Sequence, residues 1–338
     1  MPSRQVSQEE FEKLTSAYVN VTNDRLGGRV CGLSDQWFAE ASNLIKDTPP
    51  VVEVRFVATG RWYDGWETRR HNPEPSDWVV LQLGVSSAKL YGCEIDTTFF
   101  TGNYAPAISV EGAVINNANE LDGAEWETVI DKFECGPSQR QFFVRDAITN
   151  TAYTHVRLHM YPDGGIARFR MFGEPIPVFP KDKNQVIDMA AVANGGVAIA
   201  CSDQHFSSAD NLLLPGRGLD MSDGWETARS RTPGHVDWAV IKLGAPTLVD
   251  HVLIDTAFFL GNFPQHIEIH ALNAANSKDL SVNSADWKPL VGKTKTGPNQ
   301  EHKLTGPQLL SAEPITHVKL VIIPDGGVKR LRVFGRRA

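Results

Sequence analysis

The feature that most constrains this chain is an internal duplication that covers nearly its whole length. Matching segments occur in the same order in both halves: SDQWFAEASNLI (34–45) with SDQHFSSADNLL (202–213), DGWETRR (64–70) with DGWETAR (223–229), and THVRLHMYPDGG (154–165) with THVKLVIIPDGG (316–327). A spacing of about 160 residues is far longer than the period of a solenoid repeat, so it indicates duplication of a whole domain. The length of 338 residues also suits two domains better than one.

The joint between the copies is expected in the segment GEPIPVFP (173–180). Its three prolines remove backbone donors that regular secondary structure needs. We place the boundary near Pro175, which gives a first domain over residues 1–175, with a short N-terminal extension, and a second over residues 176–338.

Each copy shows the alternation of a β-protein. In THVRLHM, the apolar Val156, Leu158 and Met160 alternate with polar side chains, which is the period of a strand with one buried face. Six further short strands are expected, at 78–83, 90–96, 108–113, 126–130, 141–145 and 168–172, with Gly, Asn and Pro between them. The sequence therefore predicts an all-β chain of two tandem antiparallel β-sandwiches of the jelly-roll type, with short helices at 8–15 and 38–43.

Charge and hydropathy exclude several classes of function. The net charge is −7 and the basic residues form no stripe, so no nucleic acid is expected as a partner. No apolar run approaches the ~20 residues that span a bilayer, and the N-terminal residues lack the apolar core of a signal peptide, so we expect a cytoplasmic protein without membrane contact. The four cysteines lie too far apart in the sequence for a zinc or thioredoxin-like motif.

Repeated charged clusters mark the loop before one strand of each copy. They are Asp64, Glu67, Arg69 and Arg70 in the first copy, and Asp223, Glu226 and Arg229 in the second. Arginine can bind a carboxylate through two parallel hydrogen bonds (bidentate binding), whereas Asp and Glu accept hydrogen bonds from amide-like N–H groups. The clusters fit a small anion with N–H donors, but they also fit a simple turn with surface ion pairs, which contribute roughly 0–1 kcal/mol.

Other polar residues leave both structural and functional interpretations open. Asn103 and Asn262 follow glycine after a strand. Their amide side chains can both donate and accept hydrogen bonds, but asparagine after glycine is also an ordinary turn residue. The two PDGG segments are interpreted as turns. Asp35 and Asp203 could cap the helix that follows each of them or bind a cation, and capping is favoured. Two histidines lie near these charged residues: His71 follows Arg70, and His235 lies two residues before Asp237. Histidine can carry protons near neutral pH. No histidine pair has metal-ligand spacing, so no metal site is predicted.

Taken in order, DGWETRRHNPEPSDWVVLQLG, GCEIDTTFFTGNYAP, KFECGPSQR and MYPDGGIARFRMFG make the first half resemble an allantoicase. The second half resembles that family's own second domain, and the resemblance runs from about Asn20 to Gly335. Each half is also similar to galactose-binding or discoidin-like sandwiches, which indicates fold but not function.

The resemblance implies hydrolysis of allantoate to (S)-ureidoglycolate and urea in the use of purine nitrogen. The roles that it suggests fall on the repeated residues: Arg70 or Arg229 for the carboxylate, Asp64 or Asp223 with Asn103 or Asn262 for the ureido groups, and Glu67 or Glu226 as acid or base. Arg69, His71 and His235 complete the candidate set. It also implies a homo-oligomer, and it leaves open whether a divalent cation assists.

The two copies are not chemically equal. The second has Ala228 in place of Arg69 and His205 in place of Trp37, so we expect the first domain to contribute more to turnover. The main alternative is a non-catalytic carbohydrate-binding protein of two discoidin-like modules. In that case Trp66 and Trp225 would be exposed platforms for sugar rings, although a Trp that leads into a sandwich strand more often anchors the core.

Overall fold

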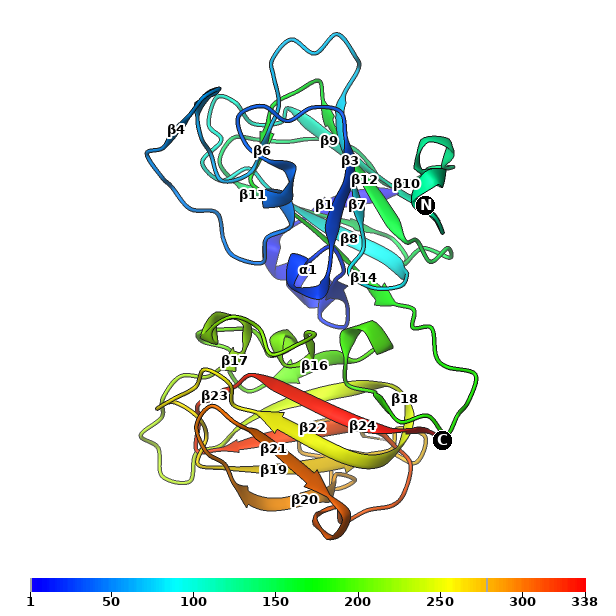
Figure 1. Ribbon diagram of the computed structural model, residues 1–338, viewed down its shortest axis with the longest axis vertical. Coiled ribbons are helices and arrows are strands. Elements are labelled where there is room, and N and C mark those ends of the chain that lie inside the picture. The colour runs from blue at the N-terminus through cyan, green and yellow to red at the C-terminus, as the bar shows by residue number, and fades with distance from the viewer. Residues whose placement is uncertain (1, 278) are drawn as a thin grey trace. The chain divides into compact units, whose positions relative to one another are not determined.

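The structure is a computed structural model and describes residues 2–277 and 279–338. The chain divides into two compact units, of which the first ends at Ile176 and the second spans Pro177–Ala338. Both units consist mainly of antiparallel strands, so the all-β fold class is confirmed (Figure 1). No helix in these described residues is long and apolar enough to cross a membrane.

The first unit has two main sheets of five strands each. One sheet contains, in order, β1 (Ser3–Val6), β11 (Arg140–Arg145), β8 (Ala88–Asp96), β14 (Arg168–Pro175) and β2 (Val19–Asn20). The other contains β10 (Glu127–Glu134), β9 (Ala107–Ala113), β12 (His155–Tyr161), β7 (Asp77–Gln82) and β3 (Arg29–Leu33). Two short pairs stand outside these sheets: β6 (Trp66–Glu67) with β13 (Gly165–Ile166), and β4 (Phe56–Val57) with β5 (Gly60–Arg61).

In the second unit, one long strand joins the layers that are separate sheets in the first. This strand is β18 (Asp237–Asp255), which pairs through its first part with β22 (Ile315–Ile323) and β16 (Val197–Cys201), and through its last part with β24 (Arg330–Arg337) and β21 (Glu301–Thr305). The sheet also contains β19 (His266–Leu272), β20 (Lys288–Lys295) and β15 (Ile187–Asp188). A short pair, β17 (Trp225–Glu226) with β23 (Gly327–Val328), repeats β6 with β13.

The core follows the alternation seen in the sequence. Val156, Leu158 and Met160 on β12 are fully buried, while Arg157 and His159 on the other face are half-buried. Each buried apolar side chain of this size stabilises the fold by roughly 1.5–3 kcal/mol. The predicted strand is therefore confirmed, and it carries its polar residues on the outer face of the sheet.

The helices agree only in part with the sequence. α1 (Gln8–Thr15) has the predicted bounds, and the Ser7 hydroxyl caps it by accepting from the backbone N–H of Glu10. The second helix is a short 3₁₀ turn over Ala41–Ile45, instead of a helix over 38–43. Ala39 forms an isolated antiparallel bridge with Glu67, so the backbone there is extended and the turn begins later.

The prediction that Asp35 and Asp203 cap these short helices is wrong. The carboxylate of Asp35 accepts from the backbone N–H and the guanidinium of Arg69. The carboxylate of Asp203 accepts from the backbone N–H of Ala228. Both aspartates therefore tie the segment after the DGWET motif to the loop that carries SDQ.

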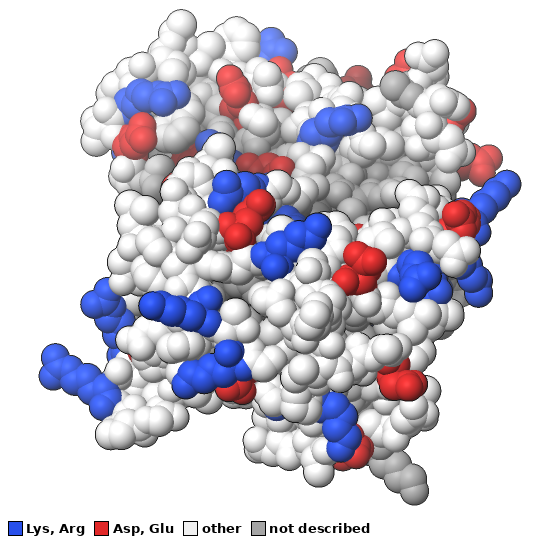
Figure 2. Space-filling model, turned by 60° about the horizontal axis from the view of Figure 1, so that its bottom comes forward, with Lys and Arg blue, Asp and Glu red and all other residues white. Residues whose placement is uncertain are grey.

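Charged side chains of both signs are mixed on the face of the molecule shown in Figure 2. On the face shown in Figure 2, lysine and arginine side chains alternate with aspartate and glutamate among uncharged residues. This mixing agrees with the scatter of charges along the sequence, and the absence of a nucleic-acid partner stays a prediction.

Candidate active site

The buried carboxyl of Glu67 forms the centre of the candidate site in the first unit. Glu67 ends β6 and is only 6% exposed. Its Oε1 accepts a hydrogen bond from Nδ2 of Asn103 at 2.8 Å, and its buried Oε2 has no hydrogen-bond partner within residues 2–277 and 279–338. Burial raises the pKa of Glu67 to about 7, against the opposing effects of the Asn103 hydrogen bond and the charge of Arg70. Glu67 can therefore accept or release a proton near neutral pH.

Arg70 is held beside this carboxyl by an aspartate that the sequence analysis did not select. Nη1 of Arg70 donates to Oδ1 of Asp163 at 2.9 Å, and the backbone N–H of Asn72 donates to Oδ2 of Asp163 at 3.2 Å. Asp163 belongs to the first PDGG segment, which was interpreted only as a turn. The available signal was that this aspartate recurs as Asp325 in the second copy, next to the same charged loop.

The second unit repeats the glutamate and asparagine pair. Nδ2 of Asn262 donates to Oε1 of Glu226 at 2.5 Å, and Glu226 is half-buried. Both residues line an open cleft of about 990 Å³, together with Arg229 and Asp325. In contrast to Arg70, the exposed Arg229 forms no ion pair with any carboxylate in the described ranges.

Asp64 and Asp223 lie in buried ion pairs away from Arg70 and Arg229. Nη2 of Arg168 donates to Oδ2 of Asp64 at 2.6 Å, and the side chain of Arg168 is fully buried. In the second unit, Arg330 lies 3.1 Å from Asp223, which also pairs with the buried Lys329. These contacts join each DG turn to the strand that begins with the arginine, through Oδ2 of each aspartate.

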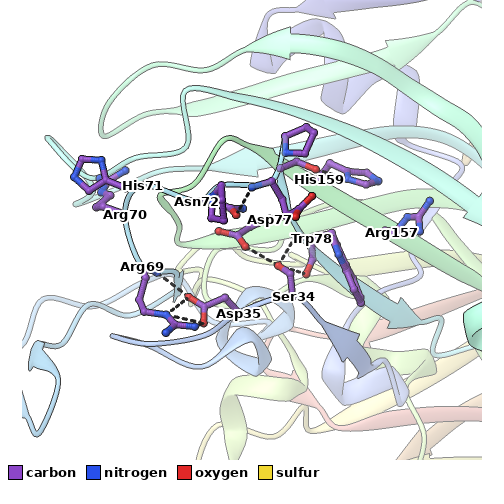
Figure 3. Close-up of a pocket in the computed structure, with 14 residues that line it drawn as sticks. Ser34, Asp35, Arg69, Arg70, His71, Asn72, Asp77, Trp78, Arg157 and His159 are labelled. Atoms are coloured by element: carbon purple, nitrogen blue, oxygen red, sulfur yellow. Dashed lines mark hydrogen bonds and ion pairs between the residues drawn. The ribbon is translucent and has the colours of Figure 1, made fainter.

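The remaining predicted residues line neither the Glu226 cleft nor any described cavity together with Glu67. Arg69 pairs with Asp35 at 2.9 Å and its side chain is 63% exposed. His71 has a left-handed backbone with φ of 64° and lines a separate cavity with Arg69 and Arg70 (Figure 3). His235 lies 3.2 Å from Oδ2 of Asp237. Within the part of the chain that the structure describes, no group of three or more His, Cys, Asp or Glu side chains could hold a metal ion.

Comparisons with known proteins place this geometry in a family. The model of the allantoicase repeat matches residues 19–176 and 187–338. The chain belongs to the allantoicase family. It is 52% identical to the allantoicase of Neurospora crassa over 345 residues, covering 100% of this chain and 97% of that protein. It is also 52% identical to the allantoicase of Saccharomyces cerevisiae, over 94% of this chain and 93% of the relative.

The fold of an allantoicase is shared as well. A crystal structure of allantoicase from Saccharomyces cerevisiae superposes with a TM-score of 0.86 at 48% identity, covering 98% of this chain and 99% of that chain. The two repeats of this allantoicase-family chain therefore adopt the architecture of a solved family member.

The two repeated tryptophans anchor the core and are not binding platforms. Trp66 and Trp225 are fully buried. The indole N–H groups donate to the carbonyl oxygens of Asp35 and Asp203, respectively, each at 2.9 Å. Because a sugar platform must expose its ring, these side chains do not support the carbohydrate-binding alternative.

Proposed function

We propose that this chain is an allantoicase, which hydrolyses allantoate to ureidoglycolate and urea. The observation that carries the proposal is the buried Glu67, which Asn103 orients through one oxygen and whose other oxygen has no protein partner among the described residues. Identity of 52% with the allantoicase of Neurospora crassa over the full chain supports the same reaction. The carboxyl is the group in the first unit best suited to proton transfer.

The substrate carries one carboxylate and two ureido groups on a single carbon. An arginine matches the carboxylate, and in the second unit Arg229 is exposed in the cleft with Glu226. In the first unit, Arg70 shares its guanidinium with Asp163. The Asn103 amide donates to Glu67, which leaves its carbonyl oxygen to accept from a ureido N–H group.

Glu67 can serve both halves of the hydrolysis. In its protonated form it donates a proton to the nitrogen of the departing urea as the C–N bond breaks. Its carboxylate then takes a proton from the water that adds to the same carbon, so one water is consumed and the carboxyl is restored. A pKa of about 7 populates both forms near neutral pH.

We assign Asp64 and Asp223 to supporting the turn and not to binding substrate, because both are already paired with buried cations. Arg69, His71 and His235 remain candidate residues for this reaction. A domain boundary at Pro175, a cytoplasmic location and a homo-oligomeric state stay predictions, and so does assistance by a divalent cation.

The test is direct assay of the purified chain with allantoate, following urea and ureidoglycolate with and without a chelator. We expect both products in equal amounts. Glu67→Gln keeps the shape of the side chain but removes its proton chemistry, so kcat should fall by about 100-fold or more. Glu125→Gln, an exposed carboxyl of the same unit, is the matched control and should retain full activity. Absence of urea release from the folded wild-type protein rejects the proposed function.

A further inference from the structure

The first unit contains a long link that has no equivalent in the second. Residues 46–63 join Ile45 to Asp64, whereas the shorter stretch 214–222 joins Leu213 to Asp223 at the matching positions. The longer link includes the sequence VVEVRFV (51–57), here called the valine-rich segment, which ends with β4. In Figure 1, β4 lies at the outer side of the first unit, away from its two main sheets. The proposed hydrolysis gives this segment no role.

Alternate residues of the valine-rich segment face opposite sides. One set lines a cavity of about 650 Å³ in the first unit, namely Val51, Glu53, Arg55 and Val57. The other set is absent from this lining and is 59%, 84% and 73% exposed, in the order Val52, Val54 and Phe56. Such alternation is that of an extended strand. The segment therefore presents an entirely apolar face to solvent.

One backbone edge of the same segment is open. The carbonyl oxygen of Arg55 accepts from the backbone N–H of Trp62 at 2.9 Å, so the backbone of Arg55 faces the β5 side. Backbone groups of successive residues in a strand point to opposite edges, so those of Val54 and Phe56 point away from β5. From Val52 to Val54, the backbone forms no backbone–backbone hydrogen bond within residues 2–277 and 279–338. An exposed edge with free backbone groups and an apolar face is a template for pairing with another chain.

The charges of the segment make it complementary to itself. Glu53 and Arg55 flank Val54, lie on the same face and are each about half exposed, with Nη1 of Arg55 3.9 Å from Oε2 of Glu53. In an antiparallel pair of two such segments with Val54 opposite Val54, Glu53 of each molecule lies opposite Arg55 of the other. Opposite charges in such cross-strand positions stabilise a pair of strands, and like charges destabilise it.

The same charges select one register. A shift by two residues keeps the apolar face on one side, but it places either Glu53 opposite Glu53 or Arg55 opposite Arg55. A shift by one residue mixes the apolar and charged faces. The register centred on Val54 is therefore the favoured antiparallel arrangement, and it also places Val52 of each molecule opposite Phe56 of the other.

We propose that the valine-rich segment is a self-association surface, at which two molecules of this chain pair their segments antiparallel about a twofold axis at Val54. The open backbone groups of Val52, Val54 and Phe56 then form hydrogen bonds across the axis, and β4 and β5 of both molecules make one four-stranded ribbon. Each molecule has one such segment and both use the same surface, so the contact closes as a pair. The proposal concerns assembly and does not depend on the proposed hydrolysis.

The experiment is sedimentation velocity of the full chain over a wide range of concentrations. We expect the wild type to associate as a dimer or a multiple of dimers. Glu53→Arg and Arg55→Glu each place like charges at both cross-strand positions, so each should weaken the association by about tenfold or more. The double variant exchanges the charges and should associate like the wild type.

An equal mixture of the two single variants gives the sharpest result. One variant then has two positive side chains and the other two negative ones, so opposite charges face each other again and the mixture should associate. Arg55 also stacks on Trp62, with its guanidinium 4.5 Å from the ring centre. Recovery in the mixture separates the effect of charge from the loss of this contact, because Arg55→Glu lacks the contact there as well.

The matched control is Leu219→Glu, which adds a charge to an apolar side chain that is 90% exposed in the shorter link of the second unit. It should leave the association within about twofold of the wild type. Circular dichroism confirms that each variant is folded. The proposal is overturned if the wild type remains a monomer, if both folded single variants associate like the wild type, or if their mixture fails to associate more strongly than either variant alone.

Discussion

The fold controls the protonation of Glu67 by burying its carboxyl, and this burial has a measurable cost in stability. Burial moves its pKa from 4.5 to about 7. The protonated form is therefore favoured in the folded state, so the stability that it contributes is complete below pH 4.5 and is lost as the pH rises through about 7. Glu67→Gln removes this titration and retains an acceptor for the Asn103 amide.

We therefore expect Glu67→Gln to gain stability relative to the wild type between pH 5 and pH 8, by up to roughly 3 kcal/mol. Urea denaturation of both proteins at several pH values measures this difference, and all other titrating groups cancel in the comparison. A difference that stays constant over this range would mean that Glu67 is ionised throughout and is not a proton donor.

For individual residues, the sequence predicted which residues belong to the site better than it predicted the contacts that their side chains make. Glu67, Arg70 and Asn103 were selected because they recur in both copies. Asp163 was missed because an aspartate between proline and two glycines is also typical of a turn. The direction of each side chain within a turn is set by tertiary packing, which the pattern of a single chain does not encode.

At the level of secondary-structure elements, the buried ion pair of Asp64 and Arg168 joins the DG turn to strand β14. Removing one partner of such a pair leaves an uncompensated buried charge. We expect Asp64→Ala to lower the free energy of unfolding by roughly 3–5 kcal/mol. The control is Glu10→Ala, which breaks the exposed ion pair with Arg4 and should leave the free energy of unfolding nearly unchanged.

Urea denaturation measures both changes, and steady-state assays show what Asp64 does. If Asp64→Ala unfolds like the wild type but loses turnover, then Asp64 acts on substrate, as its place in the repeated loop first indicated. A loss of stability with nearly normal kcat in the folded fraction supports the structural role.

Strand positions were predictable from alternation, but strand ends were less so. The segment expected at 108–113 corresponds to β9, Ala107–Ala113, whereas the one expected at 126–130 extends as β10 to Glu134. In the second unit, β18 continues through Gly244 and Pro246 to Asp255. Glycine and proline usually end strands, but here the strand bends from one layer into the other, where each part finds its own partners.

For the molecule as a whole, duplication has produced two related but unequal sites. The first combines the buried Glu67 with an Arg70 that is paired with Asp163, and the second combines a half-buried Glu226 with the exposed Arg229. The first is better suited to proton transfer, and the second offers an arginine that forms no ion pair with a carboxylate in the described residues. The fold class and the duplication were both evident from sequence, but this division of properties depends on burial, which differs between copies with almost the same motif.

Unequal contributions of the two sites to turnover can be tested with the single variants Glu226→Gln and Glu67→Gln and with the double variant. If each unit catalyses separately, their rates add. Glu226→Gln should then keep most of the wild-type turnover, Glu67→Gln should keep only the small share of the second unit, and the double variant should lose that share as well. Circular dichroism confirms folding, and product assays give kcat for each protein. Equal and nearly complete loss in both single variants contradicts separate catalysis, because it means that both carboxyl groups are needed for the same turnover.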